Sequence, residues 1–320
     1  MRDTILFGDC RQTLKEFDEK ARMCVTSPPY YGLRDYGGED SQIGQEQTPD
    51  EFIDQLVNVF KEVRNVLTDD GTCWVNLGDS YYNYRPGKGQ GLPRQTVSST
   101  KQDLPDLCPR RGNRIEGLKE KDLIGIPWLF AFAMRNDGWY LRQDIIWHKP
   151  NPMPESVRDR CTKSHEYIFL FSKNKKYFYD NEAIKEPAKD WGTRDRTNGK
   201  YHNEGTGLQP HSGLTKSYPT KNKRSVWSFT VKTYKEAHFA TYPPDLIEPC
   251  ILAGSEEGDT VIDPFMGAGT TAAVAKSLNR HYIGCELNED YGNLIQKRIQ
   301  DYQPVNKVAQ EPCINILDII

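Results

Sequence analysis

The sequence predicts an α/β protein built on a mostly parallel sheet, and three observations support that fold class. Two short apolar runs, residues 23–25 and 260–262, have the composition of buried strands, and a polar segment follows each at once. Stretches with helical spacing of apolar residues separate the strand-like runs. At 320 residues the chain is long enough for one large α/β domain with insertions, or for two modest domains.

Helices are predicted where apolar residues recur every three or four positions, and strands where short apolar runs end at turn residues. The clearest helix runs from Phe52 to Leu67 and is expected to stop at Asp69-Asp70-Gly71. The expected elements are, in order, strand 4–7, helix 11–19, a strand at Met23, helix 52–67, strand 72–77, helix 123–134, strands 139–147 and 166–171, helix 243–253, strand 260–262, helix 270–278, strand 282–285 and a helix from Asp290.

Composition indicates a cytoplasmic protein with long polar loops. The hydrophobic share is 37% and the mean hydropathy is -0.74, and no apolar stretch approaches the roughly 18 residues of a membrane helix. The first residues lead into a strand rather than a secretion signal. The eight cysteines are scattered singly, without the spacing of a zinc site, so we expect reduced thiols and no metal.

The net charge of -3 conceals two basic segments. Residues 82–121 contain nine Lys or Arg against four Asp or Glu, and residues 181–236 contain eleven against six. Residues 183–225 have almost no aliphatic side chains and cannot build a large core of their own. We therefore expect three parts: residues 1–180 with a basic insertion at 82–121, an insert at 181–236, and residues 237–320.

The C-terminal loop after residue 262 has the composition of a nucleoside-binding turn. Gly267 and Gly269 allow the backbone to pass close to a ligand, and Thr270 opens a helix whose N-terminus offers free amides. Glu286 ends the next predicted strand, 19 positions after Gly267, where an acid can bind ribose hydroxyls. The third glycine of a dinucleotide motif is missing, so a single nucleoside is expected rather than a pyrophosphate.

The N-terminal loop Thr26-Ser27-Pro28-Pro29-Tyr30 has the composition of a clamp for a flat ring. The two prolines fix φ and remove two backbone donors, so the carbonyls of Ser27 and Pro28 are left as acceptors beside an aromatic ring. Such a corner can hold a ring that carries an amino group. The simpler alternative is a rigid turn without a ligand.

Together the two loops resemble those of the DNA methyltransferases that methylate amino groups, at cytosine N4 or adenine N6, with S-adenosylmethionine. The catalytic loop precedes the cofactor loop, as in the beta class of that family. The resemblance covers nearly the whole chain, and the segments 66–72, 146–150 and 163–166 also occur in the expected order. It implies a Rossmann-like methyltransferase fold with permuted motif order, a mixed, mostly parallel sheet and helices on both faces.

The resemblance also implies roles for individual residues. Ser27, Pro28, Pro29 and Tyr30 would be catalytic. The residues that would bind S-adenosylmethionine are Asp9, Thr26, His238, Asp263, Pro264, Phe265, Gly267, Gly269, Thr270, Thr271 and Glu286. The candidates for contact with DNA phosphates are Arg110, Arg111, Arg114, Arg194, Arg196, Lys221, Lys223 and Arg224.

The implied reaction is methylation of a base flipped out of duplex DNA, without a metal or a covalent intermediate. A clamp that begins with Ser27 favours cytosine N4, and adenine N6 stays an alternative. RNA or protein methylation and a non-catalytic DNA-binding module are weaker alternatives.

Cytosine C5 methylation would need a nucleophilic cysteine after proline. Cys250 lies in an apolar helix pattern and Cys313 in the C-terminal tail, so neither fits that role. The family implies a bacterial or phage origin and allows a cognate restriction endonuclease as partner; the sequence leaves monomer and homodimer open.

Overall fold

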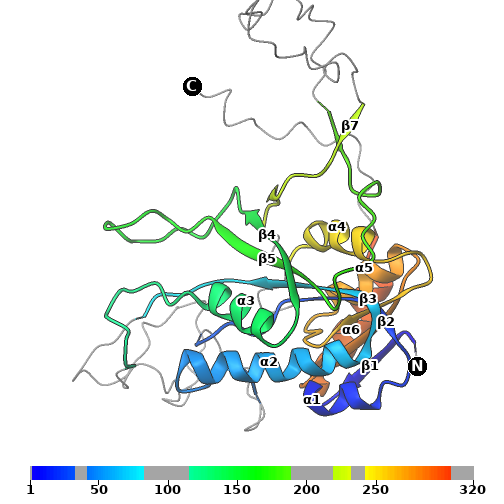
Figure 1. Ribbon diagram of the computed structural model, residues 1–320, viewed down its shortest axis with the longest axis horizontal. Helices are drawn as coiled ribbons and strands as arrows, with labels where there is room; N and C mark the ends of the chain where they lie inside the picture. Colours follow the sequence, from blue (N-terminus) through cyan, green and yellow to red (C-terminus); the bar gives the residue numbers. More distant parts are fainter. Residues whose placement is uncertain (1, 33–41, 83–114, 189–218, 232–241, 304–320) are drawn as a thin grey trace, which may run out of the picture.

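The computed structural model describes residues 2–32, 42–82, 115–188, 219–231 and 242–303 (Figure 1). Its centre is an eight-stranded sheet in the order β1-β10-β9-β2-β3-β5-β4-β8. β5 runs antiparallel to both neighbours, and the other pairings are parallel, as predicted. The strands are β1 (Thr4–Phe7), β2 (Ala21–Thr26), β3 (Leu67–Leu77), β4 (Tyr140–His148), β5 (His165–Ser172), β8 (Val226–Ser228), β9 (Thr260–Asp263) and β10 (His281–Glu286).

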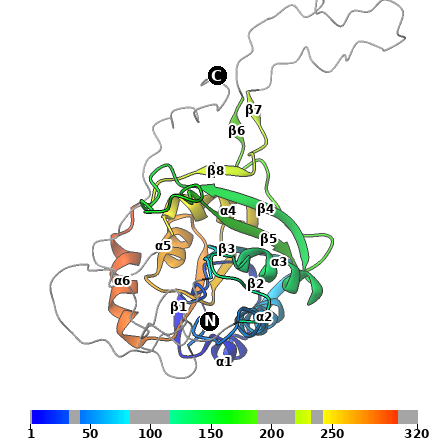
Figure 2. The same ribbon diagram turned by 90° about the vertical axis from the view of Figure 1, so that its left-hand side faces the viewer.

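Helices cover both faces of the sheet (Figures 1 and 2). α1 (Cys10–Thr13), α2 (Pro49–Val66) and α3 (Ile126–Asn136) pack on one face, and α4 (Pro244–Gly254), α5 (Thr270–Ser277) and α6 (Gly292–Asp301) on the other. Successive residues of a strand point to opposite faces. The first core lies between the sheet and α1, α2 and α3, and the second lies between the sheet and α4, α5 and α6. Cys24 and Val75 accordingly belong to the first core, and Met23 and Trp74 to the second.

Three predicted helices have wrong boundaries. The helix predicted over residues 123–134 begins only at Ile126, because Leu123 forms a β-bridge with Tyr81. α2 begins with a capping box between Thr48 and Glu51 and ends at Val66, not at Asp69-Asp70-Gly71. Leu67 is already extended and pairs with Ala21, so burial of Leu67 in the sheet ends the helix early. The helix expected over residues 11–19 is shorter, because α1 ends at Thr13 and a 3₁₀ turn, Leu14–Glu16, follows.

The segment predicted as an insert, residues 181–236, is partly built into the main sheet. β8 pairs with β4, and Trp227 on β8 is buried in the core of the second face. A separate two-stranded ribbon precedes it, formed by β6 (Glu186–Pro187) and β7 (Thr220–Lys221). Within the described ranges, no helix is long and apolar enough to cross a membrane.

Candidate active site

The clamp and the glycine loop meet at one edge of the sheet. β2 and β9 are parallel neighbours, so the loops that follow them leave from the same carboxyl edge. The Thr26 hydroxyl donates to Oδ1 of Asp263 at 2.5 Å, and both residues are buried. The clamp therefore starts beside the glycine loop, because Ser27 follows Thr26 and Pro264 follows Asp263.

Asp263 is a buried acceptor that ties this edge together. Its carboxylate accepts hydrogen bonds from the Thr271 hydroxyl, from the Tyr242 hydroxyl at 3.1 Å and from the Phe265 amide at 3.0 Å. Burial raises the pKa of Asp263, and the hydrogen bonds from Thr26, Thr271 and Phe265 oppose that shift. The contacts of Asp263 and Thr271 within the protein indicate that they shape the loop.

The two glycines of the loop have different surroundings. Both have positive φ, +53° at Gly267 and +81° at Gly269. A Cβ atom on Gly267 would meet nothing closer than the Phe265 carbonyl oxygen at 3.9 Å, so this position borders open space. A Cβ atom on Gly269 would lie 2.9 Å from Cγ2 of Ile295 on α6. Gly267 thus leaves room for a ligand, whereas Gly269 allows α6 to pack against the start of α5.

Glu286 ends β10 and faces the same turn. Its Oε2 accepts from the Gly267 amide at 2.8 Å, and its Oε1 accepts from the Asn288 amide at 3.0 Å. Burial raises the pKa of Glu286, and the two amide donors oppose the shift. A carboxylate oxygen has two lone pairs, so each oxygen keeps acceptor capacity beyond its amide.

Asp9 lies next to this acid but has a local partner. The Gly8 amide donates to the Glu286 carbonyl oxygen at 2.9 Å, which brings the two segments together. Asp9 caps α1 and forms an ion pair with Arg11 at 2.6 Å. Burial alone would raise the pKa of Asp9, but the bonds and charge of Arg11 lower it. His238 lies outside the described residues.

The clamp follows β2 and contacts side chains of β3 and β5. Pro28 is buried, and Ser27, Pro29 and Tyr30 are partly exposed. The Tyr30 hydroxyl donates to Oε2 of Glu166 at 2.7 Å, and its ring packs so tightly against Gly78 that a Cβ atom there would lie 2.7 Å away. Phe265, expected beside the cofactor, is partly buried against the first core.

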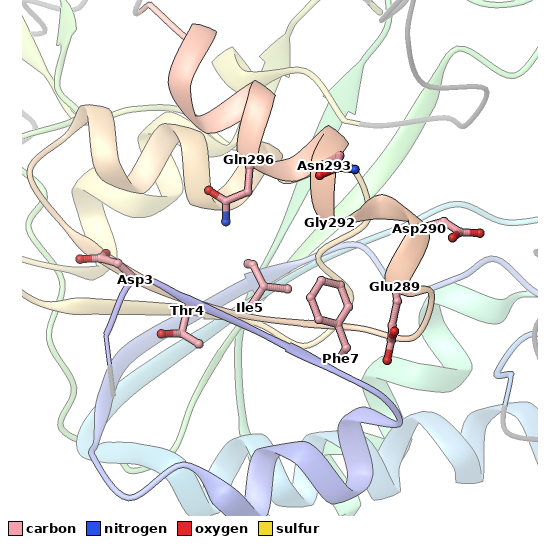
Figure 3. Close-up of a pocket in the computed structure, with 9 residues that line it drawn as sticks. All are labelled: Asp3, Thr4, Ile5, Phe7, Glu289, Asp290, Gly292, Asn293 and Gln296. Carbon is pink, nitrogen blue, oxygen red and sulfur yellow. The ribbon is translucent and has the colours of Figure 1, made fainter.

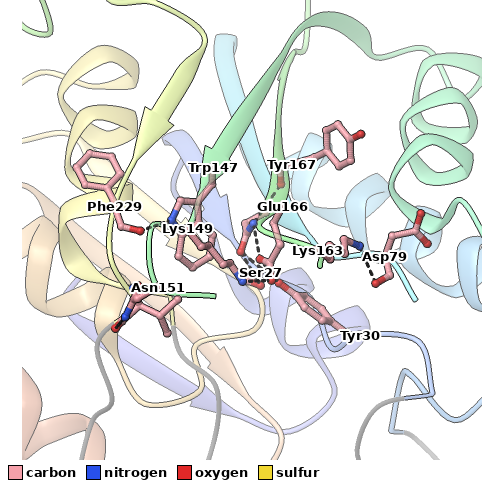
Figure 4. Close-up of polar contacts among 12 residues, drawn as sticks. Ser27, Tyr30, Asp79, Trp147, Lys149, Asn151, Lys163, Glu166, Tyr167 and Phe229 are labelled. Carbon is pink, nitrogen blue, oxygen red and sulfur yellow. Dashed lines mark hydrogen bonds and ion pairs between the residues drawn. The ribbon is translucent and has the colours of Figure 1, made fainter. Parts of the chain in front are cut away.

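A polar network behind the clamp includes residues that the sequence did not single out. We define the Glu166 network as Ser27, Tyr30, Asn76, Lys149 and Glu166. Lys149 forms an ion pair with Glu166, and Asn76 bonds Glu166 at 3.2 Å and Ser27 at 3.4 Å. Figure 4 shows Ser27, Tyr30, Lys149 and Glu166 converging at the start of β5. Lys149 and Glu166 lie in segments 146–150 and 163–166, which the resemblance expects in this order along the chain, whereas Asn76 has no sequence signal beyond its strand.

The described candidates for DNA contact differ in their surroundings. Lys223 is mostly buried, with its ammonium 3.6 Å from Glu186 and 5.1 Å from the centre of the Trp227 ring. Arg224 is more exposed and lies 3.5 Å from the same glutamate, and Lys221 lies on β7. The other predicted contacts lie outside the described residues: Arg110, Arg111, Arg114, Arg194 and Arg196.

Two further features lie apart from the clamp. A surface depression of about 590 Å³ lies between β1 and α6, and Figure 3 shows the residues that line it. None of the described residues predicted to be catalytic or to bind the cofactor is among them. Cys250 is fully buried in α4, where burial raises the pKa of its thiol. It is therefore the structural thiol that the sequence predicted; Cys313 lies outside the described residues.

Sequence comparisons identify a matching family and similar proteins. The N6/N4 family described as DNA methylase matches residues 21–297. The chain is 45% identical to the Type II methyltransferase M.XycI of Xanthomonas campestris pv. cyanopsidis, over 94% of this chain and 89% of that protein. It is 46% identical to the Type II methyltransferase M.SmaI of Serratia marcescens, over 92% of this chain and 90% of that protein.

Solved structures share the fold. The PvuII DNA methyltransferase, described as cytosine-N4-specific, aligns with a TM-score of 0.60 at 18% identity, over 96% of this chain and 88% of that chain. The M1.HpyAVI–SAM complex aligns with a TM-score of 0.53 at 17% identity, over 92% and 98% of the two chains. These similarities confirm the predicted arrangement of sheet and helices.

Proposed function

The chain belongs to the N6/N4 DNA methylase family, and from that premise we propose that it transfers a methyl group from S-adenosylmethionine to N4 of a cytosine flipped out of duplex DNA. The bond between Thr26 and Asp263 carries this proposal, because it holds the clamp against the glycine loop. Ser27 at the head of the clamp supports cytosine as the target. The cytosine-N4 specificity of the PvuII neighbour supports the same base.

The residues beside Gly267 fit S-adenosylmethionine. Gly267 borders open space, and Glu286 retains acceptor capacity for two ribose hydroxyls. The ring of Phe265 would flank the adenine, and Asp9 lies in the segment that joins Glu286 through Gly8. When bound, the cofactor supplies an electrophilic methyl group.

The clamp acts on the amino group of the base. Its nitrogen is a weak nucleophile, because the lone pair is delocalised into the ring. The Ser27 hydroxyl and the Pro28 carbonyl would accept the amino hydrogens and draw the nitrogen toward tetrahedral geometry, while the Tyr30 ring stacks on the base. Holding two reactants in line contributes about 7 to 11 kcal/mol to catalysis, so positioning carries most of the rate.

The direct test is mass spectrometry of nucleosides from mixed-sequence DNA incubated with the protein and S-adenosylmethionine. The expected product is N4-methylcytosine. N6-methyladenine would keep the clamp chemistry and change the target base. If cofactor binds but no methylated deoxynucleoside forms, DNA methylation by this chain is contradicted.

The affinity for S-adenosylmethionine is expected to fall as the pH is lowered through the pKa of Glu286. Burial raises that pKa above the ordinary 4.5, so the acceptor is lost at a higher pH than for an exposed glutamate. Calorimetric titrations at a series of pH values, from neutral downward, would show the loss. Glu286→Gln should bind about tenfold or more weakly, with little pH dependence. An equal pH slope in wild type and variant would argue against this role.

Alanine at the two glycines should separate ligand binding from packing. Gly267→Ala is expected to cost about 1 kcal/mol of stability from its positive φ and to weaken cofactor binding at least about tenfold, because its methyl group enters the open space. Gly269→Ala adds a clash with Ile295, so its stability loss should reach about 2 to 3 kcal/mol. Urea unfolding and calorimetry measure the two effects, and reversed rankings would contradict the assignment.

The names of the two relatives support one further part of the proposal. Both are Type II methyltransferases, which supports a cognate restriction endonuclease as partner of this chain. DNA treated with the protein and S-adenosylmethionine should then resist that endonuclease. Equal cleavage of treated and untreated DNA would count against the pairing.

A further inference from the structure

The orientation of the Asn76 amide is determined by its neighbours. Asn76 lies on the interior strand β3 and is only 4% exposed. One end of its amide lies 3.2 Å from Oε2 of Glu166 and 3.1 Å from the Tyr167 carbonyl oxygen. The Tyr167 carbonyl oxygen can only accept, and so can Glu166 when it is ionised, so that end must be the Nδ2 donor. Oδ1 therefore faces the opposite way, toward Ser27 and Tyr30.

The position of the hydroxyl protons follows from the distances. The Tyr30 hydroxyl carries one proton and lies 2.7 Å from Glu166 but 3.4 Å from Oδ1 of Asn76. The Tyr30 hydroxyl therefore donates its hydrogen bond to the Glu166 carboxylate, which is the nearer and the charged acceptor. Oδ1 is then an acceptor for the Ser27 hydroxyl, also at 3.4 Å. With its proton directed at Asn76, the lone pairs of the Ser27 oxygen remain for another donor.

Glu166 has a charged partner that keeps it an acceptor. It forms an ion pair with Lys149, and the two side chains are 11% and 18% exposed. The Lys149 ammonium also lies 4.3 Å from the centre of the Trp147 ring, whose indole donates to the Phe229 carbonyl at 2.9 Å (Figure 4). The nearby Lys163 donates instead to the Asp79 carbonyl at 2.8 Å.

We propose that Glu166, held by Lys149, is a positioning residue for methyl transfer. Together with the Tyr167 carbonyl it orients the Asn76 amide, and it accepts the hydrogen bond of the Tyr30 hydroxyl. The Ser27 hydroxyl is thereby kept with its lone pairs toward the amino group of the target base. The proposal rests on the proposed function for the role of Ser27. It adds a specific dependence: the charge of Glu166 matters to the rate only through the Ser27 hydroxyl.

Glu166→Gln in two backgrounds tests this dependence. Glutamine can donate to Asn76 as well as accept, so only the Tyr167 carbonyl still favours the wild-type orientation of the amide, and the direction of the Ser27 proton is less well fixed. In wild type the substitution should lower the single-turnover methylation rate about tenfold or more, with the affinity for S-adenosylmethionine within about twofold. In a Ser27→Ala background it should cause no further loss, because residues that act as one unit are not additive. A multiplied loss in that background, or an unchanged rate in wild type, would overturn the proposal.

Folding needs its own control, because Glu166→Gln leaves the Lys149 ammonium without its carboxylate. The double variant Lys149→Met/Glu166→Gln removes both charges. It should unfold at a temperature close to wild type and still show the slow transfer. Recovery of the wild-type rate in this variant would mean that the unpaired lysine caused the defect, which would overturn the role of Glu166. The identity of the methylated nucleoside is a separate readout: N6-methyladenine would correct the proposed base, and the same rate pattern would still decide the role of Glu166.

Discussion

Replacement of Ser27 by alanine is expected to lower the single-turnover methylation rate about 100-fold and to leave the affinity for S-adenosylmethionine within about twofold. In the proposed mechanism the hydroxyl accepts an amino hydrogen at the moment when the nitrogen develops positive charge, so its loss should be felt mainly in the transition state. The Ser27 hydroxyl lies on the clamp, whereas the proposed cofactor site is formed by Gly267 and Glu286. Rapid-quench assays of labelled DNA measure the rate, and calorimetry measures the affinity.

A matched serine provides the control for that experiment. Ser277 on α5 donates to the Val274 carbonyl at 2.8 Å, within its own helix and outside the Glu166 network. Ser277→Ala should therefore leave the rate unchanged. Ser27→Ala with full activity would remove Ser27 from the catalytic role, and Ser27→Ala with weakened cofactor binding would mean that the clamp also shapes the cofactor site.

The positions of both loops could be predicted because each follows a short apolar strand and carries residues with few conformations. Pro28, Pro29, Gly267 and Gly269 restrict or extend φ in ways that a sequence reader can use. That the two loops lie side by side was harder to predict, because 237 positions separate Thr26 from Asp263. It followed from the rule that ligands bind at the carboxyl edge of parallel strands.

Asn76 could not be predicted, for a physical reason. It lies among apolar residues of β3, and its role comes from Glu166 on the neighbouring antiparallel strand. Strand pairing between β3 and β5 brings them together across 90 positions, and no local pattern encodes that register. β8 escaped detection similarly, because its three residues are too short to show a period and are placed by pairing with β4.

Replacement of Asp263 by alanine is expected to lower the free energy of unfolding by about 3 kcal/mol. The change leaves the hydroxyls of Thr26 and Thr271 and the amide of Phe265 without their acceptor in a buried place, whereas the Tyr242 hydroxyl keeps the Thr271 hydroxyl as a partner. Each such loss costs about 1 kcal/mol. Urea unfolding followed by circular dichroism measures the change. A loss below about 1 kcal/mol would mean that water or neighbouring groups replace the carboxylate.

Asp263→Asn separates the charge of this residue from its acceptor role through the pH dependence. Burial raises the folded-state pKa of Asp263, so its contribution to stability is fully present below the unfolded pKa and is lost as the pH rises through the folded pKa. Asparagine keeps one acceptor oxygen and does not titrate. The stability deficit of Asp263→Asn relative to wild type should therefore shrink as the pH rises through that folded pKa. A deficit that grows with pH would mean that the hydrogen bonds from Thr26, Thr271 and Phe265 outweigh the cost of burying the charge, and that the carboxylate is the favoured form in the folded protein.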